Sequence, residues 1–181
     1  MSKSLNYLLP KYQFREYHSI SVNREINDVF GYVKEMDLCD STIASILMFL
    51  WRIIARLFVK DLPNSNMSVS HFIQLECSPP FELSRGLIGG KSKPTNYEEI
   101  SSSDFRNFDT KGTIKLVWAF WLSSDVSGST IIHTETRVFC CDKLTYLKFL
   151  LYWIIIRPWS GLIRIRLLKS IKKKAELIKA L

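Results

Sequence analysis

The sequence predicts an α+β fold in which a curved antiparallel sheet packs against a long carboxyl-terminal helix. Three observations predict it. Strand-like alternation fills much of the chain before residue 141, helical periodicity fills the segment after it, and no helix alternates with strands in a βαβ repeat. A chain of 181 residues, of which 47% are hydrophobic, is long enough for a single domain with a full core.

The amino-terminal part predicts one strand followed by two helices. Residues 12–22 alternate and are rich in aromatic and β-branched side chains, which is typical of a strand. Asn23 is a candidate N-cap for a short helix that ends near Met36. A second helix begins at Asp40 or Ser41 and runs to about residue 59. Apolar residues surround much of this second helix, so we expect it to be substantially buried.

The middle of the chain predicts the remaining strands. Residues 71–77 and 81–90 form two short strands separated by the sequence SPP, and a long polar connection with one helical turn follows. Residues 113–122 (TIKLVWAFWL) predict an apolar strand. After a hairpin loop that contains Gly128, residues 130–140 predict the long strand that returns.

The chain from Asp142 onward predicts a helix with one break. Pro158 removes the hydrogen bond to the carbonyl of Ile154, and Ser160 can cap a restarted helix. The alternative for this proline is a simple bend that keeps the helix on a curved sheet. We expect an apolar stripe of the helix to cover the sheet, formed by Leu147, Leu151, Ile154, Ile155, Leu162, Ile163, Leu167 and Ile171.

The positive charge belongs to the carboxyl-terminal segment. Residues 142–181 hold ten of the 25 Lys and Arg residues but only two of the 17 acids, which accounts for the whole net charge of +8. The segment Arg164–Lys179 is therefore a candidate for weak contact with an anionic membrane or a polyanion, or else it is a solvated helix face. No aromatic side chains interleave with its lysines, so we expect no specific nucleic-acid site.

Several functional classes lack their sequence signals. The start of the chain has no apolar stretch typical of a signal peptide, and the two most apolar stretches are interrupted by arginines or too short to span a membrane, so we expect a cytoplasmic protein. No nucleotide-binding loop is present, and we expect no cofactor. The four cysteines lack zinc-site spacing and are interpreted as reduced thiols, and no metal is expected; they are Cys39, Cys77, Cys140 and Cys141.

Two segments carry a resemblance to a known family. The sequences GSTIIHTETRVFCCD (128–142) and FLLYWIIIRPWSGLIRIRLLKSIKKKAE (149–176) resemble a bacterial subfamily of the START-like (SRPBCC) superfamily, which includes the birch-pollen allergen and polyketide-cyclase-like proteins. That subfamily similarly reads T-x-L-x-T-E-T-R-V, a strand-ending Asp, then F-x-x-Y-W-x-x-I-R-P-x-S-G-L-I-R. The resemblance implies a helix-grip fold, in which about seven strands wrap around the terminal helix and leave a cavity.

Charged residues on one predicted strand raise the question of what the cavity holds. His133, Glu135 and Arg137 share a face of the strand over residues 130–140. One interpretation places Glu135 and Arg137 in the cavity, where the guanidinium orients the polar end of a ligand. The other makes them a structural ion pair, tied to the terminal helix. The histidines, His18 and His133 among them, have no carboxylate at motif spacing, so no catalytic residue is assigned.

The leading functional expectation is binding of a small hydrophobic or amphipathic molecule between the sheet and the terminal helix. Affinity would come from apolar burial against aromatic side chains, although the same side chains can serve as plain core. The alternatives are a cyclase or dehydrase-like enzyme and an interaction protein acting through the basic helix. The candidate cavity residues are Arg85, Leu87, Trp118, Phe120, His133, Glu135, Arg137, Tyr152, Trp153 and Ile156.

Overall fold

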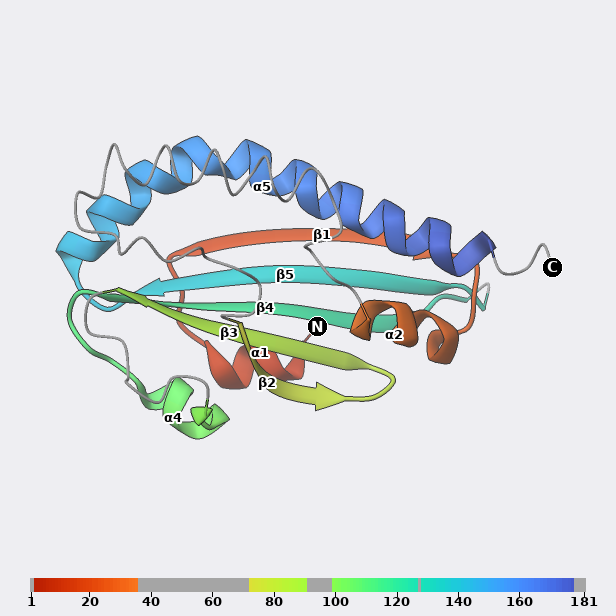
Figure 1. The fold of residues 1–181 in the computed structure, drawn as a ribbon, viewed down its shortest axis with the longest axis horizontal. Coiled ribbons are helices and arrows are strands. Elements are labelled where there is room, and N and C mark those ends of the chain that lie inside the picture. Colours follow the sequence, from red (N-terminus) through yellow and green to blue (C-terminus); the bar gives the residue numbers. More distant parts are fainter. Residues whose placement is uncertain (1, 36–71, 91–98, 127, 178–181) are drawn as a thin grey trace.

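A computed structural model describes residues 2–35, 72–90, 99–126 and 128–177 (Figure 1). The second helix expected after the first strand lies outside these residues. The described elements are α1 (Lys3–Leu8), β1 (Phe14–Val22), α2 (Ile26–Lys34), β2 (Ile73–Ser78), β3 (Glu82–Gly90), α4 (Ser102–Asn107), β4 (Thr113–Ser124), β5 (Thr130–Cys140) and α5 (Lys143–Leu177).

The predicted α+β class is confirmed. The strands form a curved antiparallel sheet in the order β1-β5-β4-β3-β2, with α5 as the long carboxyl-terminal helix (Figure 1). The described part of this sheet has five strands, compared with the expected seven. Every strand predicted from alternation over residues 12–22, 71–77, 81–90, 113–122 and 130–140 is present within two residues of its expected ends.

Helices cover both faces of the sheet (Figure 1). On one face, α2 and α5 bury an apolar cluster that includes Trp118, Phe120 and Ile171. On the other face, α1 and α4 bury a second cluster around Phe105 and Val117. The covering of this second face by α1 and α4 was not expected, because only one face of an antiparallel sheet has to be buried. It gives β4 and β5 nearly continuous burial instead of strict alternation.

Local signals place the short helices. The hydroxyl of Ser2 accepts a hydrogen bond from the backbone N–H of Leu5 at 2.9 Å and so caps α1, a helix that the sequence analysis missed. The helix α2 begins at Ile26 with Glu25 at its N-cap, so the prediction of a cap at Asn23 was wrong. The expected helical turn in the polar connection is confirmed as α4, capped by Ser101.

The helix α5 runs through Pro158 without interruption, so the predicted break there was wrong. Proline removes one helical hydrogen bond, but packing holds the helix on both sides of it. Trp153 packs with Phe14 of β1 before the proline, and Leu168 and Ile171 pack against the sheet after it. Figure 1 shows the result as an arched helix that stays on the sheet over its full length.

The stripe predicted to face the sheet points mostly away from it. Leu147, Leu151, Ile154 and Leu162 are exposed, and among the predicted stripe residues only Ile171 is fully buried. The sheet instead receives Tyr146, Phe149, Leu150, Trp153, Ile156 and Leu168. The prediction failed because both sides of the first half of α5 are apolar, so periodicity alone could not tell which side faces the sheet.

Candidate functional site

The predicted site residues lie on both faces of the sheet and do not line one cavity together. Antiparallel register places Trp118 opposite Thr136 and Phe120 opposite Thr134, on the face that carries α5. His133, Glu135 and Arg137 alternate with these threonines and therefore point to the other face, toward α1. The expected combination of aromatic lining with the Arg137 guanidinium in one cavity is thus not formed.

Glu135 and Arg137 form a closed ion pair with the amino-terminal segment. The Nε of Arg137 donates to Glu135 at 2.7 Å, and the side chains of both residues are 2% exposed. Arg137 also donates to the side chain of Asn6 at 3.0 Å and to the carbonyl of Leu9 at 3.3 Å. Its guanidinium lies 4.6 Å from the ring centroid of Tyr12. The pair is therefore tied to α1 and the segment after it, not to the terminal helix as expected.

A second arginine, Arg15, also binds Glu135. Arg15 of β1 lies directly opposite Arg137 of β5, a like-charge arrangement that is unfavourable on its own. Glu135 accepts hydrogen bonds from both, with Arg15 at 2.9 Å. Burial alone would raise the pKa of Glu135, but the hydrogen bonds from Arg15 and Arg137 outweigh it and lower that pKa. Glu135 thus stays ionised, with both carboxylate oxygens hydrogen-bonded to arginines. This supports the interpretation of Glu135 and Arg137 as a structural ion pair.

His133 lies in an aromatic stack on the same face. Its ring is stacked on Trp121 with centroids 5.0 Å apart. The Nδ1 atom is 2.8 Å from the Tyr17 hydroxyl, and the Nε2 atom is 3.0 Å from the Ser123 hydroxyl. Burial lowers the pKa of His133. Both ring nitrogens are therefore engaged by neutral hydroxyls, and no carboxylate orients the ring.

The remaining predicted site residues are buried or half-buried. Trp118 and Phe120 are buried with ring centroids 5.0 Å apart, and the Trp118 indole N–H donates to Thr134 at 2.8 Å. Arg85 is half-buried on β3 opposite Trp118, whereas Leu87 is buried in the cluster beneath α1. On α5, Ile156 is buried and the other two pack against aromatic neighbours, Tyr152 on Phe149 and Trp153 on Phe14.

A polar group that the sequence analysis did not assign lies between the sheet and α5. We call it the Glu16 cluster: Glu16 and His18 of β1, Thr136 of β5, and Ser160 and Arg164 of α5. Glu16 accepts from Ser160 and from Arg164, both at 2.9 Å, and its other oxygen lies 3.1 Å from His18 Nε2. Arg164 also donates to Thr136 at 2.7 Å. The cluster therefore joins three elements across the interior.

The Glu16 cluster is not fully satisfied. The Nε of Arg164 is buried and has no hydrogen-bond partner among the described residues. Burial lowers the pKa of Arg164, and the nearby Glu16 carboxylate opposes this shift. Gly161 lies beside the cluster, where an added Cβ would come within 3.0 Å of a Glu16 oxygen and 3.6 Å of the His18 ring. A glycine thus keeps the helix close to these groups, and a buried donor remains available.

Two spacings could have revealed this cluster. Ser160 and Arg164 are four residues apart, so they lie on one side of a helix, and Glu16 and His18 are two residues apart on one strand face. The interpretation that no carboxylate accompanies His18 was therefore wrong, because Glu16 contacts it. Arg164 was placed in the basic segment expected either to contact an anionic partner or to be solvated, but it points inward to Glu16.

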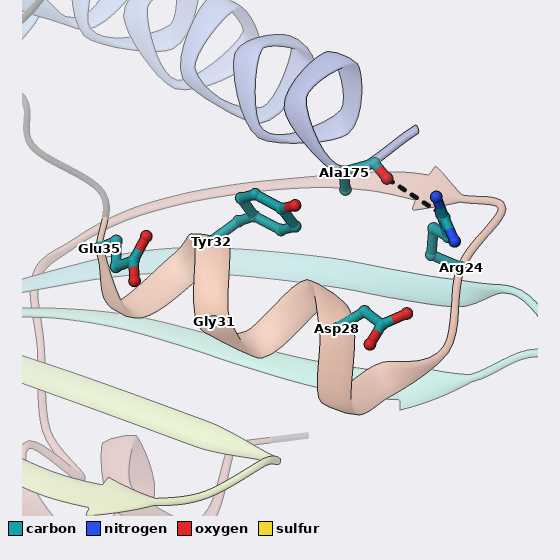
Figure 2. A pocket seen from close by; sticks show the side chains of 6 residues that line it. All are labelled: Arg24, Asp28, Gly31, Tyr32, Glu35 and Ala175. Atoms are coloured by element: carbon teal, nitrogen blue, oxygen red, sulfur yellow. Dashed lines mark hydrogen bonds between the residues drawn. The ribbon is translucent and has the colours of Figure 1, made fainter. Parts of the chain in front are cut away.

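A pocket of about 340 Å³ lies elsewhere, where α2 meets the end of α5 (Figure 2). Its lining is mostly polar and includes Arg24, Asp28, Tyr32 and Glu35. Figure 2 shows Arg24 reaching the end of α5, where it donates to the carbonyl of Ala175 at 3.0 Å. This pocket differs in place and polarity from the predicted apolar cavity.

Across residues 2–35, 72–90, 99–126 and 128–177, no three His, Cys, Asp or Glu side chains gather closely enough to hold a metal ion. In the same parts of the chain, no helix has both the length and the apolar character needed to cross a membrane. No protein-family profile, no curated protein and no solved structure matches this chain.

Proposed function

We propose that this protein is a START-like, helix-grip binding module that holds a small amphipathic molecule between the sheet and α5, with its polar end at the Glu16 cluster. The observation that carries the proposal is the buried, unpartnered Nε of Arg164 within that cluster. A buried donor without a partner is costly, and a ligand that accepts its hydrogen bond removes that cost.

The surroundings of the cluster suit an amphipathic molecule. It separates two apolar groups on the same face of the sheet: the cluster around Trp118, Leu168 and Ile171, and the cluster around Phe14 and Trp153. A ligand that is apolar along its length with one hydrogen-bond acceptor matches this arrangement of a polar centre and apolar flanks. The acceptor is a carboxylate, carbonyl or hydroxyl oxygen, since the free group is an N–H donor.

The proposal moves the polar contact from one arginine to another. Arg137, Glu135 and His133 point to the opposite face, so the role first given to them passes to Arg164 and its partners Glu16 and His18. Trp118 and Phe120 keep their proposed role as apolar lining, because they lie on the α5 face beside Thr134 and Thr136.

Mass spectrometry of a solvent extract of the purified native protein tests the proposal. We expect a stoichiometric small molecule from the wild type and its loss from Arg164→Met. The matched control is the double variant Glu135→Leu with Arg137→Met, which also removes a buried arginine but on the other face. Circular dichroism shows that each variant folds. A 1:1 titration with 8-anilinonaphthalene-1-sulfonate supplies a second measurement for a protein that is purified empty.

Two results would overturn the proposal. The first is an empty extract combined with no saturable dye site in the wild type. The second is a molecule that is retained by folded Arg164→Met but lost from the control double variant, because that would place the contact on the α1 face of the sheet.

One observation favours a second candidate, a cyclase or dehydrase-like enzyme at the same position. His18 lies 3.1 Å from Glu16, its side chain is 23% exposed, and an imidazole beside a carboxylate can act as a general base. Extracts of the wild type and of His18→Gln separate the two functions. An enzyme would yield different molecules from the two proteins, substrate from the variant and product from the wild type; they differ in mass by one water after a dehydration and in chromatographic retention alone after a cyclisation. A binding module would yield the same molecule from both.

A further inference from the structure

The outward side of α5 is divided along its length into an apolar part and a basic part. At 3.6 residues per turn, Leu144, Leu147, Leu151, Ile154, Leu162 and Ile165 fall within a sector of about 80°. All six are exposed, with Leu144 at 63% and Ile154 at 62%. Arg166, Lys169 and Lys173 continue the same side toward the carboxyl terminus and are also exposed.

We propose that this outward side of α5 docks on an anionic lipid surface, with the leucines and isoleucines entering the acyl boundary and the basic residues at the headgroups. Exposed apolar side chains in a continuous row mark an interaction site more strongly than scattered ones. Charge complementarity selects the partner, because α5 carries nine Lys and Arg residues and one acid, Glu176.

The shape of the helix fits contact in the plane of a membrane surface. The apolar row from Leu144 to Ile165 spans about 32 Å of helix at 1.5 Å per residue, which suits a helix lying in the interface. Trp159 lies at the edge of the row, is 49% exposed and suits the headgroup level. Among the described elements, α5 is the outermost layer on its side of the sheet (Figure 1), so the row can approach a flat surface.

The inference concerns different atoms from the Glu16 cluster. Ser160 and Arg164 face inward to β1 and β5, whereas the apolar row faces away from them. Membrane docking and ligand binding can therefore succeed or fail separately. Leu147→Gln should keep the extracted ligand while losing vesicle binding.

Vesicle flotation tests the docking proposal. We expect binding of the full chain to vesicles of phosphatidylcholine with phosphatidylserine, weaker binding to phosphatidylcholine alone, and release by high salt. Leu147→Gln should weaken binding at least ten-fold, since it removes a side chain from the apolar boundary. Phe81→Gln is the matched control, because Phe81 is as exposed as Leu147, at 57%, but lies between β2 and β3.

The basic part of α5 is tested by a triple variant and a matched control. Changing Arg166, Lys169 and Lys173 to Gln should weaken binding roughly a hundred-fold, at about five-fold for each charge near an anionic surface. Changing Lys3, Lys11 and Lys111 to Gln alters the net charge equally at exposed positions outside α5 and should leave binding within a few-fold.

Four results would overturn the docking proposal. Absence of vesicle binding by a monomeric wild type would mean that the row does not dock on lipid. Concentration-dependent dimers that Leu147→Gln dissociates, without vesicle binding, would mean that a second copy occupies it. Vesicle binding that is equally sensitive to Phe81→Gln would mean nonspecific adsorption. Vesicle binding that requires the basic residues but not Leu147 would mean a purely electrostatic contact, without insertion of the apolar row.

Discussion

Each face of the sheet buries a glutamate beside an arginine, and the two pairs differ in how completely they are satisfied. Glu135 and Arg137 belong to one strand, their side chains are 2% exposed, and every partner is supplied by β1 or the segment around α1. Glu16 and Arg164 belong to β1 and α5, and one nitrogen of Arg164 has no partner among the described residues.

The difference separates a structural pair from a candidate binding group. A buried ion pair is tolerated when hydrogen bonds satisfy it, and it then has little left with which to bind a ligand. Glu135 and Arg137, on the face of the sheet that α1 covers, meet this condition. The Glu16 cluster forms only when α5 docks on the sheet. It has a half-buried histidine at its rim, and the Nε of Arg164 finds no partner in the part of the chain that the structure describes. Substitutions on each face measure how far the two pairs differ.

The largest expected effect is the loss of Glu135. The substitution Glu135→Leu leaves Arg137 buried without its carboxylate, which should lower the free energy of unfolding by about 3–5 kcal/mol. Urea unfolding followed by circular dichroism measures this.

Two further variants test whether the unpaired buried charge of Arg137 causes this loss of stability. Arg15→Met removes the partner that is 47% exposed, so it should lower the unfolding free energy by only about 0–1 kcal/mol. The double variant Glu135→Leu with Arg137→Met should recover most of the loss, because no buried charge stays unpaired. If Arg15→Met proved as harmful as Glu135→Leu, the closed pair would not be the source of the effect.

A smaller effect is expected on the other face. Arg164→Met should lower the unfolding free energy by about 1–3 kcal/mol, because Glu16 keeps its contacts with Ser160 and His18. Lys169→Met is the control on the same helix, since Lys169 is exposed and its loss should change stability by about 0.5 kcal/mol or less. If Arg164→Met lowered the unfolding free energy as much as Glu135→Leu, the two buried ion pairs would not differ in how completely they are satisfied.

The strands could be predicted because their signals are local. Alternation over residues 12–22 and 130–140 reports which side chains share a face, and that grouping of His133, Glu135 and Arg137 is confirmed. The direction in which the shared face points is not local. It depends on which helix covers it, and α1 is a six-residue helix with one capping serine that the sequence analysis passed over.

The site was harder to predict because its parts come from distant segments. Glu16 and Arg164 are 148 residues apart in the chain, and only the docking of α5 brings them together. In addition, α5 is apolar on both sides over its first half, so its inward side could not be chosen from the pattern. The choice of the wrong side hid Arg164 as an interior residue and placed Leu147 and Leu151 there instead.

Two helical glycines test the close approach at the Glu16 cluster. Gly31→Ala in α2 meets open space, so alanine should stabilise the protein by about 0.5–1 kcal/mol through helix propensity. Gly161→Ala gains the same propensity but places a Cβ 3.0 Å from Glu16, so we expect little or no net gain. Thermal unfolding of the two variants compares them. Equal stabilisation would mean that the cluster yields easily and is looser than its contacts indicate.

The smallest expected effect is a difference in acid sensitivity. The pKa of Glu135 is lowered from its ordinary value of 4.5, so its contribution to stability is present above that value and is lost as the pH falls. Unfolding free energies at several pH values between 5 and 2.5 should therefore fall more steeply in the wild type than in the double variant Glu135→Leu with Arg137→Met. Asp142, whose pKa is lowered to about 2 by hydrogen bonds from Thr145 and Gly112, contributes to both proteins and cancels in the difference. Identical slopes would show that Glu135 gains nothing on folding from its two arginines, and the contrast between a closed and an open pair would then fail.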